Sequence, residues 1–535
     1  MQRAILRSSV APVRPQLALS RTTVASNASF STQTATAPTS GDPALIWTTP
    51  KWAPSSVRPY KDKSTAELLN SYTVFKLCEF PPLVAITPTL IDVAEMTGTK
   101  FLMNAAVKKT FFKHFCGGET IKEVLPTMIK MKQNNMGAIL DLAMEADMET
   151  EAEPTTAEAK AASSHIFTLM KESVDIASET PGSFIAAKVT AYVPPGVLLR
   201  WTNTLRLVEE AFNTVKDSNG HATRATLMKV LNKTFPQLTP FHVKTLGVDE
   251  NANIDWITLS DYFTFTNKST RAGLITTLPS SVNSLLHPVS NPVDFETLDA
   301  VTADLASLMQ YSTDKQVKVM VDAEQTYFQR AIDDISLSLC RAYNTSGNVV
   351  VFNTYQMYLK DGLTRLQTDL ERASRAGWTF GVKIVRGAYM VSERERAQEM
   401  GYTDPINATI ADTHACYNNA IDHLLANLNR GLEFVVASHN KSSVAKTVAA
   451  LEKNGVSPDN KQISFAQLMG MQDATSVALA KNGYRVFKYV PYGPIDVTIP
   501  YLLRRAQENS SVLGGVGEDK RELVAELGRR MRSEK

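Results

Sequence analysis

The sequence predicts an α/β protein whose core is a (βα)8 TIM-like barrel, and three observations support this prediction. Short apolar runs recur eight times, and each is followed by a segment with helical periodicity. Most of them are short apolar runs of the kind that parallel pairing buries on both faces. No GxGxxG motif follows any of them, which weakens the alternative of a doubly wound sheet. The runs cover residues 137–143, 183–191, 317–324, 349–355, 380–388, 433–439, 461–468 and 484–490.

Polar side chains stand where the predicted strands end. In such barrels the carboxyl ends of the strands line the active site, so we expect these side chains to gather at one mouth. They are Asp141, Lys188, Asp322, Gln356, Arg386, His439 and Tyr489.

The N-terminal 41 residues differ in composition from the rest of the chain. They are rich in Ser, Thr and Ala, and no acid precedes Asp42. Their basic residues are Arg3, Arg7, Arg14 and Arg21. An Arg-bearing segment without acids is typical of a mitochondrial presequence, so we expect a presequence over 1–41. Residues 42–136 are expected to form a linker followed by helices.

Bulk properties narrow the possible partners. The net charge of +2 gives no reason to expect a nucleic acid or another polyanion. No apolar run of about 18 residues exists, so a membrane-spanning helix is not expected; the segment PPLVAITPTLI at 81–91 is too short and contains Pro88. Four cysteines lack metal-ligand spacing and suit a reducing compartment, so no metal site is expected.

More than a hundred residues separate Lys188 from Val317, too many for a barrel crossover. We therefore expect a helical insertion over 192–316, within a barrel domain that spans 137–515. Two stretches of it, FNTVKDSNGHATRATLMKVL and TLGVDENANIDWITLSDYF, resemble EF-hand loops in tandem. Neither fulfils the calcium pattern, because the second has Ala252 in the turn and no glutamate at the twelfth position. A tail helix is expected over 516–535.

A helix predicted from about Ile499 places four polar residues on one face. Tyr501, Arg504, Arg505 and Glu508 stand at i, i+3, i+4 and i+7. Two guanidiniums beside an aromatic ring suit a small carboxylate, which they can hold bidentately. The alternative is a solvated face with a surface Arg504–Glu508 pair. Glu on the C-terminal side of Arg is the weaker order for such a pair, however.

Six motifs together resemble the proline dehydrogenase family, in its monofunctional mitochondrial type, over about 137–513. They are VMVDAEQTYFQRAID, VVFNTYQMYLKDGL, KIVRGAYM, ASHN, FAQLMGMQD and YVPYG…YLLRRAQEN, in the family's order. The resemblance implies FAD-dependent oxidation of L-proline to 1-pyrroline-5-carboxylate, with hydride transfer to flavin N5. It also implies electron transfer to a membrane quinone, and peripheral association with the matrix side of the inner mitochondrial membrane.

The resemblance also assigns substrate and catalytic residues. Arg504, Arg505 and Lys188 match the family's cations for the proline carboxylate, and Asp322 matches an aspartate that orients a basic neighbour. Leu468 would cap the apolar substrate ring, and Glu145 would pair with Arg505 to close the pocket. The aromatic lining matches Tyr389, Tyr489 and Tyr501.

For FAD, bound without a Rossmann domain, the resemblance implies a second set of residues. Gln356 would hydrogen-bond the isoalloxazine ring. His439 and Asn440 would contact the ribityl or phosphate side. At Met390, bacterial relatives carry a Trp that can stack on adenine. The remaining expected cofactor residues are Lys383, Arg386, Gly387, Ala388 and Glu508.

Three other functions stay open from the sequence. An FAD barrel enzyme acting on hydroxyproline or another cyclic imino acid is the same-class alternative. A folate-reducing flavoprotein would use the same barrel but consume NAD(P)H. A non-enzymatic, calcium-responsive matrix protein would use the EF-hand-like insertion instead.

Overall fold

The computed structural model describes residues 58–144, 154–238, 251–274, 292–345, 347–511 and 515–532. The chain divides into two units, Met1–Thr48 and Thr49–Lys535, and the described residues all belong to the second. The predicted presequence over 1–41 therefore lies outside the described residues and stays a prediction.

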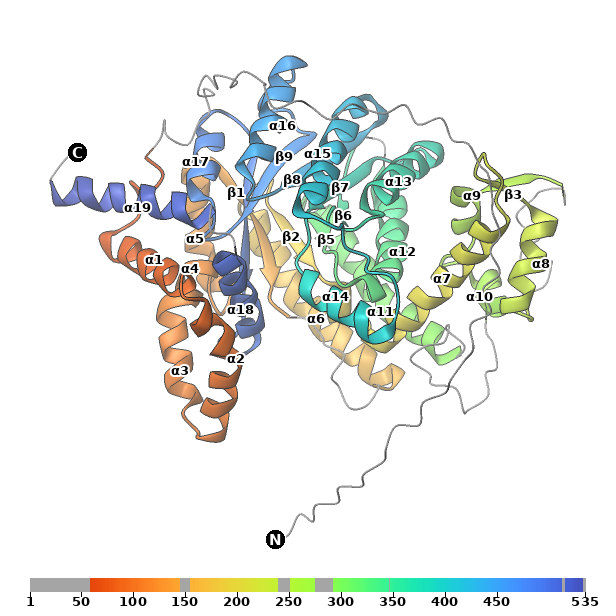
Figure 1. Ribbon diagram of the computed structural model, residues 1–535, viewed down its shortest axis with the longest axis horizontal. Helices are drawn as coiled ribbons and strands as arrows, with labels where there is room; N and C mark the ends of the chain where they lie inside the picture. The colour runs from red at the N-terminus through yellow and green to blue at the C-terminus, as the bar shows by residue number, and fades with distance from the viewer. Residues whose placement is uncertain are drawn as a thin grey trace, which may run out of the picture. The chain divides into compact units, whose positions relative to one another are not determined.

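Eight parallel strands form a closed barrel, which confirms the predicted fold (Figure 1). Around the barrel each strand pairs with the next barrel strand along the chain. The ring closes where β10 pairs with β1, in the register Met136↔Val486. The strands are β1 (Met136–Leu142), β2 (Phe184–Ala187), β5 (Lys318–Val321), β6 (Val351–Gln356), β7 (Phe380–Val385), β8 (Leu432–Ala437), β9 (Ile463–Leu468) and β10 (Val486–Tyr492).

All eight predicted runs overlap a barrel strand, but the second run was predicted too long. β2 ends at Ala187, and Val189–Ala191 forms a 3-10 turn instead of more strand. The carboxylate of Glu324 accepts hydrogen bonds from the Thr190 amide and hydroxyl, at 3.2 and 2.6 Å, and so holds this turn. Lys188 consequently stands directly at the barrel mouth.

The lower part of the barrel interior is filled by aromatic rings. Phe184 packs edge-on against Phe352 and Phe487, with ring centroids 5.5 and 4.7 Å apart. Gly137 is required here, because a Cβ at this position would lie 2.4 Å from the Phe487 ring. The interior is therefore closed by side chains at this level, and polar groups remain at the carboxyl ends of the strands.

Helices cover the outside of the barrel. Some begin with strong caps: Thr155 and Glu158 form a capping box at one helix, and Thr409 and Asp412 form another. Gly377 ends a third helix in the left-handed conformation. The helices after the strands are α6 (Thr156–Ser178), α11 (Pro292–Asp314), α12 (Thr326–Tyr343), α13 (Gly362–Ala376), α14 (Met390–Met400), α15 (Ile410–Ala426), α16 (Lys441–Lys453), α17 (Asp473–Lys481) and α18 (Ile495–Ser511).

The helix that follows β10 begins earlier than predicted. It starts at Ile495 rather than at about Ile499, and it contains Pro500. Proline has no amide to donate and disfavours helical backbone at the residue before it, so a start before Pro500 is not evident from the sequence. Pro500 lies beyond the first turn of α18, so the helix lacks one backbone hydrogen bond there.

An N-terminal helical region precedes the barrel, as predicted. Near its start, Arg58 forms an ion pair with Glu526 at 3.0 Å, and so joins the region to the C-terminal helix α19 (Gly515–Met531). The elements of the region are α1 (Thr65–Cys78), α2 (Pro81–Met96), α3 (Lys100–Val107), the π-helix η2 (Lys108–Phe112), α4 (Lys113–Phe115) and α5 (Ile121–Gln133).

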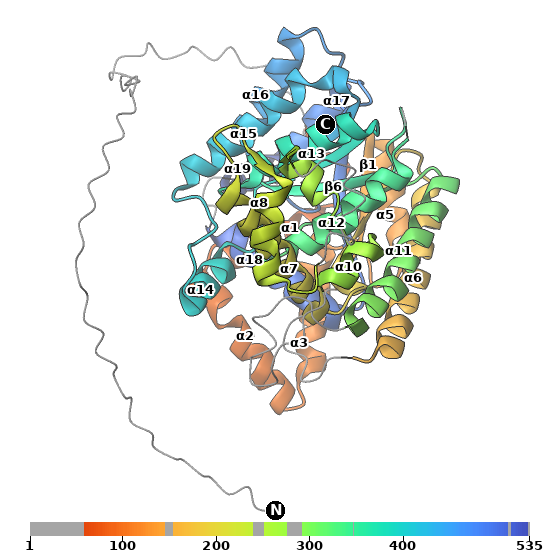
Figure 2. The ribbon, with the colours of Figure 1, turned by 90° about the vertical axis from the view of Figure 1, so that its right-hand side faces the viewer.

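An insertion lies between β2 and β5, the second and third barrel strands, as predicted. Two short strands within it pair antiparallel, with Ala222 opposite Ile254, and a helix follows each. In Figure 2 the insertion lies in front of α12. Its elements are α7 (Pro195–Val215), β3 (His221–Thr223), α8 (Arg224–Thr234), β4 (Asn253–Asp255), α9 (Trp256–Ser260) and α10 (Lys268–Leu274). The likeness to EF-hand loops stays a prediction.

Candidate active site

Five strand-end side chains meet as one buried polar cluster at the barrel mouth. The Lys188 ammonium donates to Asp141 and lies 3.7 Å from the Asp322 carboxylate. Lys383 donates to the other Asp322 oxygen, and the Tyr489 hydroxyl donates to Asp322 at 2.6 Å. Asp322 therefore joins two lysines and a tyrosine that come from three different strands. Lys188 and Lys383 are both buried.

Charges within this cluster are balanced. Burial alone would raise the pKa of Asp322, but the charges of Lys383 and Lys188 lower it overall. Burial, together with the negative charges of Asp141 and Asp322, raises the pKa of Tyr489 well above its ordinary value. Two ammonium groups thus face two carboxylates, and the neutral tyrosine is held as a hydrogen-bond donor.

Asp141 is a partner that sequence reasoning named as a strand end but left without a role. It is buried at the end of β1, and its carboxylate accepts the hydrogen bond of Lys188. The strand-end position was the signal. Its pairing with Lys188 depends on β1 and β2 being neighbours in the barrel, where Asp141 lies opposite Ala186.

Helix α18 brings its polar face to the same mouth. Tyr501 and Arg505 are 8% and 5% exposed, and the Arg505 guanidinium lies 5.0 Å from the centre of the Tyr501 ring. Arg504 is half-buried, and its guanidinium lies 6.0 Å from the centre of the Tyr389 ring. Tyr501 contributes to the raised pKa of Tyr489, which places the helix beside the buried cluster.

This burial excludes a solvated face for Arg505. An arginine that packs against an aromatic ring at the barrel mouth suits recognition of a carboxylate. Glu508 lies on the same helix, but its side chain is outside the described part, as is all of Glu145. The roles expected for these two glutamates stay predictions.

Leu468 is the last residue of β9 and lies beside α18. It packs, half-buried, against an apolar cluster that includes Tyr501, Met471 and Phe115. The Leu468 amide donates to Nε2 of His439 at 3.0 Å, so the imidazole proton resides on Nδ1. Burial, together with the positive charges of Lys488 and Arg505, lowers the pKa of His439 to about 3. His439 is therefore neutral near pH 7.

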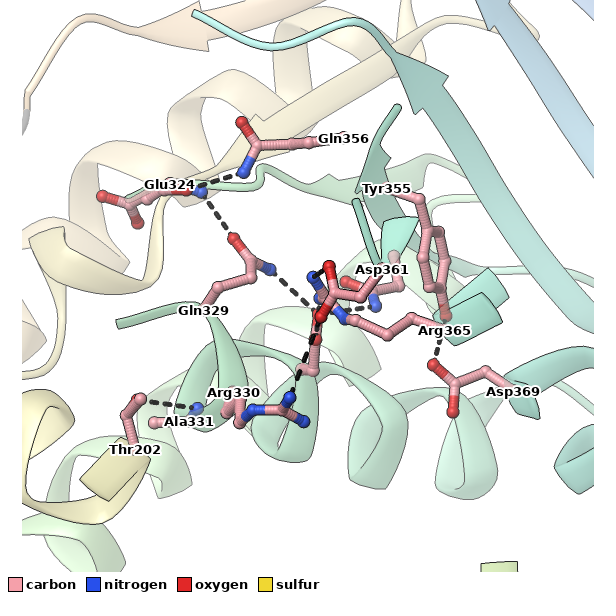
Figure 3. Close-up of polar contacts among 12 residues, drawn as sticks. Thr202, Glu324, Gln329, Arg330, Ala331, Tyr355, Gln356, Asp361, Arg365 and Asp369 are labelled. Atoms are coloured by element: carbon pink, nitrogen blue, oxygen red, sulfur yellow. Dashed lines mark hydrogen bonds and ion pairs between the residues drawn. The ribbon is translucent and has the colours of Figure 1, made fainter. Parts of the chain in front are cut away.

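Glu324 holds three strand ends together, and sequence reasoning missed it. Its carboxylate binds Thr190 after β2, while its backbone carbonyl accepts from Gln356 Nε2 at 2.7 Å, at the end of β6 (Figure 3). Its amide donates to Gln329 at 2.8 Å. The signal was a glutamate two residues after Asp322. We infer that Glu324 fixes the side chain of Gln356.

The Gln329 side chain extends this support outward. Gln329 donates to Asp333 at 2.9 Å, and Asp333 pairs with Arg365. Each of these three side chains comes from α12 or α13, so the polar contacts that support Gln356 extend to two barrel helices.

Arg386 is a partly buried cation at the end of β7. Its guanidinium donates to the Ser438 and Ser443 hydroxyls at 2.7 and 2.9 Å and lies 4.3 Å from the centre of the Tyr417 ring. Among the described residues no carboxylate pairs with it, and burial lowers its pKa. A nearby anion would stabilise this charge. The α16 N-terminus, capped by Asn440, lies beside it and favours an anion too.

Gly387 and Ala388 follow in the chain. Gly387 has a φ of +141°, and a Cβ there would lie 2.4 Å from the Tyr358 ring. Only glycine meets both conditions at this turn. Ala388 is exposed, and so is Met390 at the start of α14. The backbone here is thus open to a ligand lying along the mouth.

The structure therefore brings most predicted site residues to one place. Lys188, Asp322, Lys383 and Tyr489 form the buried cluster, and α18 lies beside it with Tyr501 and both arginines. Gln356, Arg386 and His439 stand at strand ends around the same mouth. A small carboxylate beside Arg505 would lie next to a buried cluster in which two lysines are balanced by two carboxylates.

Comparison with known proteins supports the family that the sequence motifs resemble. Residues 124–518 match the family model described as proline dehydrogenase. Human mitochondrial proline dehydrogenase 1 is 32% identical, with 89% of this chain and 88% of that protein covered. The fruit-fly protein of the same name is 30% identical over 89% of this chain and 80% of its own. Bovine hydroxyproline dehydrogenase is 31% identical over 88% and 91%.

A solved structure shares the fold. Proline utilization A (PutA) of Bdellovibrio bacteriovorus aligns with a TM-score of 0.53 and 18% identity, over 86% of this chain. This chain spans only 38% of that longer protein, and at this identity the likeness shows the fold alone. The family model covers well over half of the sequence, and the human relative exceeds 30% identity along most of both chains. The chain therefore belongs to the proline dehydrogenase family.

Proposed function

We propose that this protein oxidises L-proline to 1-pyrroline-5-carboxylate with FAD as the hydride acceptor. The observation that carries the proposal is the pairing of a buried arginine face on α18 with the charge-balanced cluster around Asp322. Family membership supplies the reaction, and the geometry supplies a place for its substrate.

The carboxylate of proline would bind at Arg505 and Arg504. Arg505 is buried against Tyr501, so its position is largely fixed before substrate arrives. Lys188 would take part as a further donor, its own charge balanced by Asp141 and Asp322. Tyr489 and Leu468 would then border the apolar ring carbons. This arrangement favours a small cyclic amino acid over a neutral amine, because an amine without a carboxylate cannot accept hydrogen bonds from the guanidiniums.

The mouth also suits FAD. Among the described residues no carboxylate pairs with Arg386, and the α16 N-terminus, which favours an anion, lies beside it. Gln356, Lys383 and His439 would hold the ring and chain of the cofactor at the strand ends. Bound FAD supplies acceptance of a hydride, which amino-acid side chains cannot provide. The protein's own part is to fix the substrate, orient it and exclude water.

We further propose a place in mitochondria, on the matrix side of the inner membrane, with a membrane quinone as electron acceptor and peripheral membrane association. The Arg-bearing, acid-free segment before Asp42 supports import, and the human, fly and bovine proline dehydrogenases carry "mitochondrial" in their names. The quinone follows from the family resemblance.

The decisive test is the visible spectrum of the purified protein, recorded anaerobically before and after addition of proline. We expect a flavin spectrum that bleaches with proline. The Arg505→Met variant should retain the flavin but raise KM for proline about 10- to 100-fold, since hydrogen bonds to a charged group contribute roughly 1.5–3 kcal/mol. Arg430→Met is the matched control, because Arg430 pairs with Glu371 outside the mouth.

Two results would contradict the proposal. Protein that stays colourless after supplementation with FAD would show that it does not bind this cofactor. An unchanged KM in Arg505→Met, with normal activity, would remove the carboxylate clamp.

Hydroxyproline is a second candidate substrate, because the bovine hydroxyproline dehydrogenase is 31% identical and the human proline dehydrogenase is 32% identical, at nearly equal coverage. Parallel turnover assays with proline and 4-hydroxyproline separate the two. A higher kcat/KM for 4-hydroxyproline would reassign the substrate while keeping the flavin chemistry.

A further inference from the structure

Exposed apolar side chains gather on the helical hairpin formed by α2 and α3 (Pro81–Val107), hereafter the α2–α3 hairpin. Among the described residues, 18 large apolar side chains are exposed, and seven of them fall between positions 80 and 102. They are Phe80, Ile86, Leu90, Val93, Met96, Phe101 and Leu102. Monomeric proteins rarely leave such a group uncovered, so this surface marks an interaction site.

The apolar side chains on α2 form one stripe. Ile86, Leu90 and Val93 stand at i, i+4 and i+7, and this spacing places them on one helical face. Asp92 and Glu95 lie away from the centre of that stripe by the same periodicity. Glu95 is further engaged by Lys100 at 2.5 Å. The stripe on α2 is therefore apolar over about two turns, while Asp92 and Glu95, which are also exposed, lie outside it.

The end of the hairpin is its most exposed apolar part. Met96 is 87% exposed and Phe101 is 69% exposed, on either side of the turn at Thr97–Thr99, and Leu102 follows. In both ribbon views α2 and α3 lie side by side and point away from the barrel strands (Figures 1 and 2).

Cations follow directly after the hairpin, in η2 and α4. Lys109 and Lys113 are exposed, and Lys109 lies seven residues after Leu102. At 1.5 Å per residue this corresponds to about 11 Å along the helix. Interfacial helices bury their apolar face roughly 5–10 Å into the boundary between headgroups and acyl chains. With Phe101 and Leu102 at that depth, Lys109 would lie at the level of the lipid phosphates.

The hairpin is fixed to the candidate active site. Asn104 donates to Asp496, at the beginning of α18, at 2.8 Å. Phe112 and Phe115, just after α3 in the chain, share an apolar cluster with Tyr501 of the same helix. A surface that holds the end of the hairpin would therefore lie near the helix that carries both arginines.

We propose that the α2–α3 hairpin docks this protein on an anionic lipid bilayer, with the Met96–Leu102 end entering the interface and Lys109 and Lys113 facing lipid phosphates. None of the described helices has the length and apolar character needed to cross a membrane, so the hairpin would enter one leaflet only. The apolar end and the cations behind it complement a bilayer surface in both polarity and charge. The purpose of the docking, access to a membrane quinone, rests on the proposed function.

Vesicle sedimentation tests the proposal without substrate or electron acceptor, so its outcome is independent of the proposed reaction. The full chain should sediment with vesicles of phosphatidylcholine and phosphatidylglycerol. The Met96→Ser, Phe101→Ser and Leu102→Ser substitutions should each weaken the partition constant about tenfold. Replacing Lys109 or Lys113 by Gln should weaken it about fivefold each, and only with the anionic vesicles.

Met531→Ser is the matched control, because Met531 is also 87% exposed but lies on α19. It should leave the partition constant unchanged. All variants should oxidise substrate with a soluble dye acceptor at the rate of the parent protein. Binding that persists in the Met96, Phe101 and Leu102 triple serine variant would overturn the proposal. So would a change in sedimentation-derived mass of that variant without loss of vesicle binding, which would assign the face to a second copy of this chain.

Discussion

Replacing Asp322 by asparagine keeps the shape of a buried side chain and removes the charge that two lysines face. Lys383 donates to Asp322, and Lys188 lies 3.7 Å from it. At an effective dielectric constant of about 20, two unit charges at this separation interact by about 4–5 kcal/mol. Removing one partner of a buried pair costs about 3–5 kcal/mol in proteins. We therefore expect the variant to lose about 3–5 kcal/mol of unfolding free energy near pH 7.

Urea-induced unfolding, followed by intrinsic fluorescence, measures this loss. Asp422→Asn is the matched control, because Asp422 pairs with Lys446 at 2.6 Å while both side chains are well exposed. Exposed pairs contribute about 0–1 kcal/mol, so this control should change the unfolding free energy little. Equal losses in the two variants would refute the assignment of Asp322 as the electrostatic centre of the mouth.

The comparison between the parent protein and Asp322→Asn should also show how the unfolding free energy depends on pH. The pKa of Asp322 is lowered in the folded state, so its stabilisation is fully present above the unfolded value of about 3.9. It is lost as the pH falls through the lower, folded value. The difference in unfolding free energy between the parent protein and Asp322→Asn should thus be constant from pH 7 to about 4 and shrink below. A difference that changes between pH 7 and 5 would contradict this reasoning.

Three further predictions concern other buried groups. Burial lowers the pKa of His114 to about 3, so the unfolded chain binds a proton below about pH 6.5 that the folded protein does not. Stability should fall by up to about 1.4 kcal/mol per pH unit between those values, and urea midpoints at pH 7 and 5 should show a smaller fall in His114→Asn. Glu324→Gln should loosen Gln356 and weaken FAD retention on dialysis while proline KM at saturating FAD stays unchanged. Gly387→Ala must displace the Tyr358 ring, and should lower both flavin content and the thermal midpoint; retention of both would contradict the tight turn.

Residue patterns along the chain were enough to predict the barrel and the residues that lie at its mouth. Strand burial on both faces is recorded locally as a short apolar run, and the polar residue that ends each run stays at the carboxyl edge in any parallel barrel. Lys188, Asp322, Gln356 and Tyr489 could be placed at one mouth for this reason.

Local patterns could not say which helical face is buried. The spacing of Arg504 and Arg505 fitted both a substrate clamp and a solvated face, and only packing of α18 against the mouth buries Arg505 while Arg504 stays half-exposed. The segment 81–91 likewise looked like an apolar run too short to span a membrane. Its exposed stripe became visible only when the packing of α2 was known.

What the sequence determined by itself was the order of strands and the chemical character of their ends, because both depend on neighbours within a few residues. What only the tertiary structure decided was the pairing across the mouth. Asp141 reaches Lys188, and Glu324 joins Thr190 to Gln356, across separations of 32 to 134 residues in the chain. Such contacts depend on the closure and register of the barrel, which no single segment encodes.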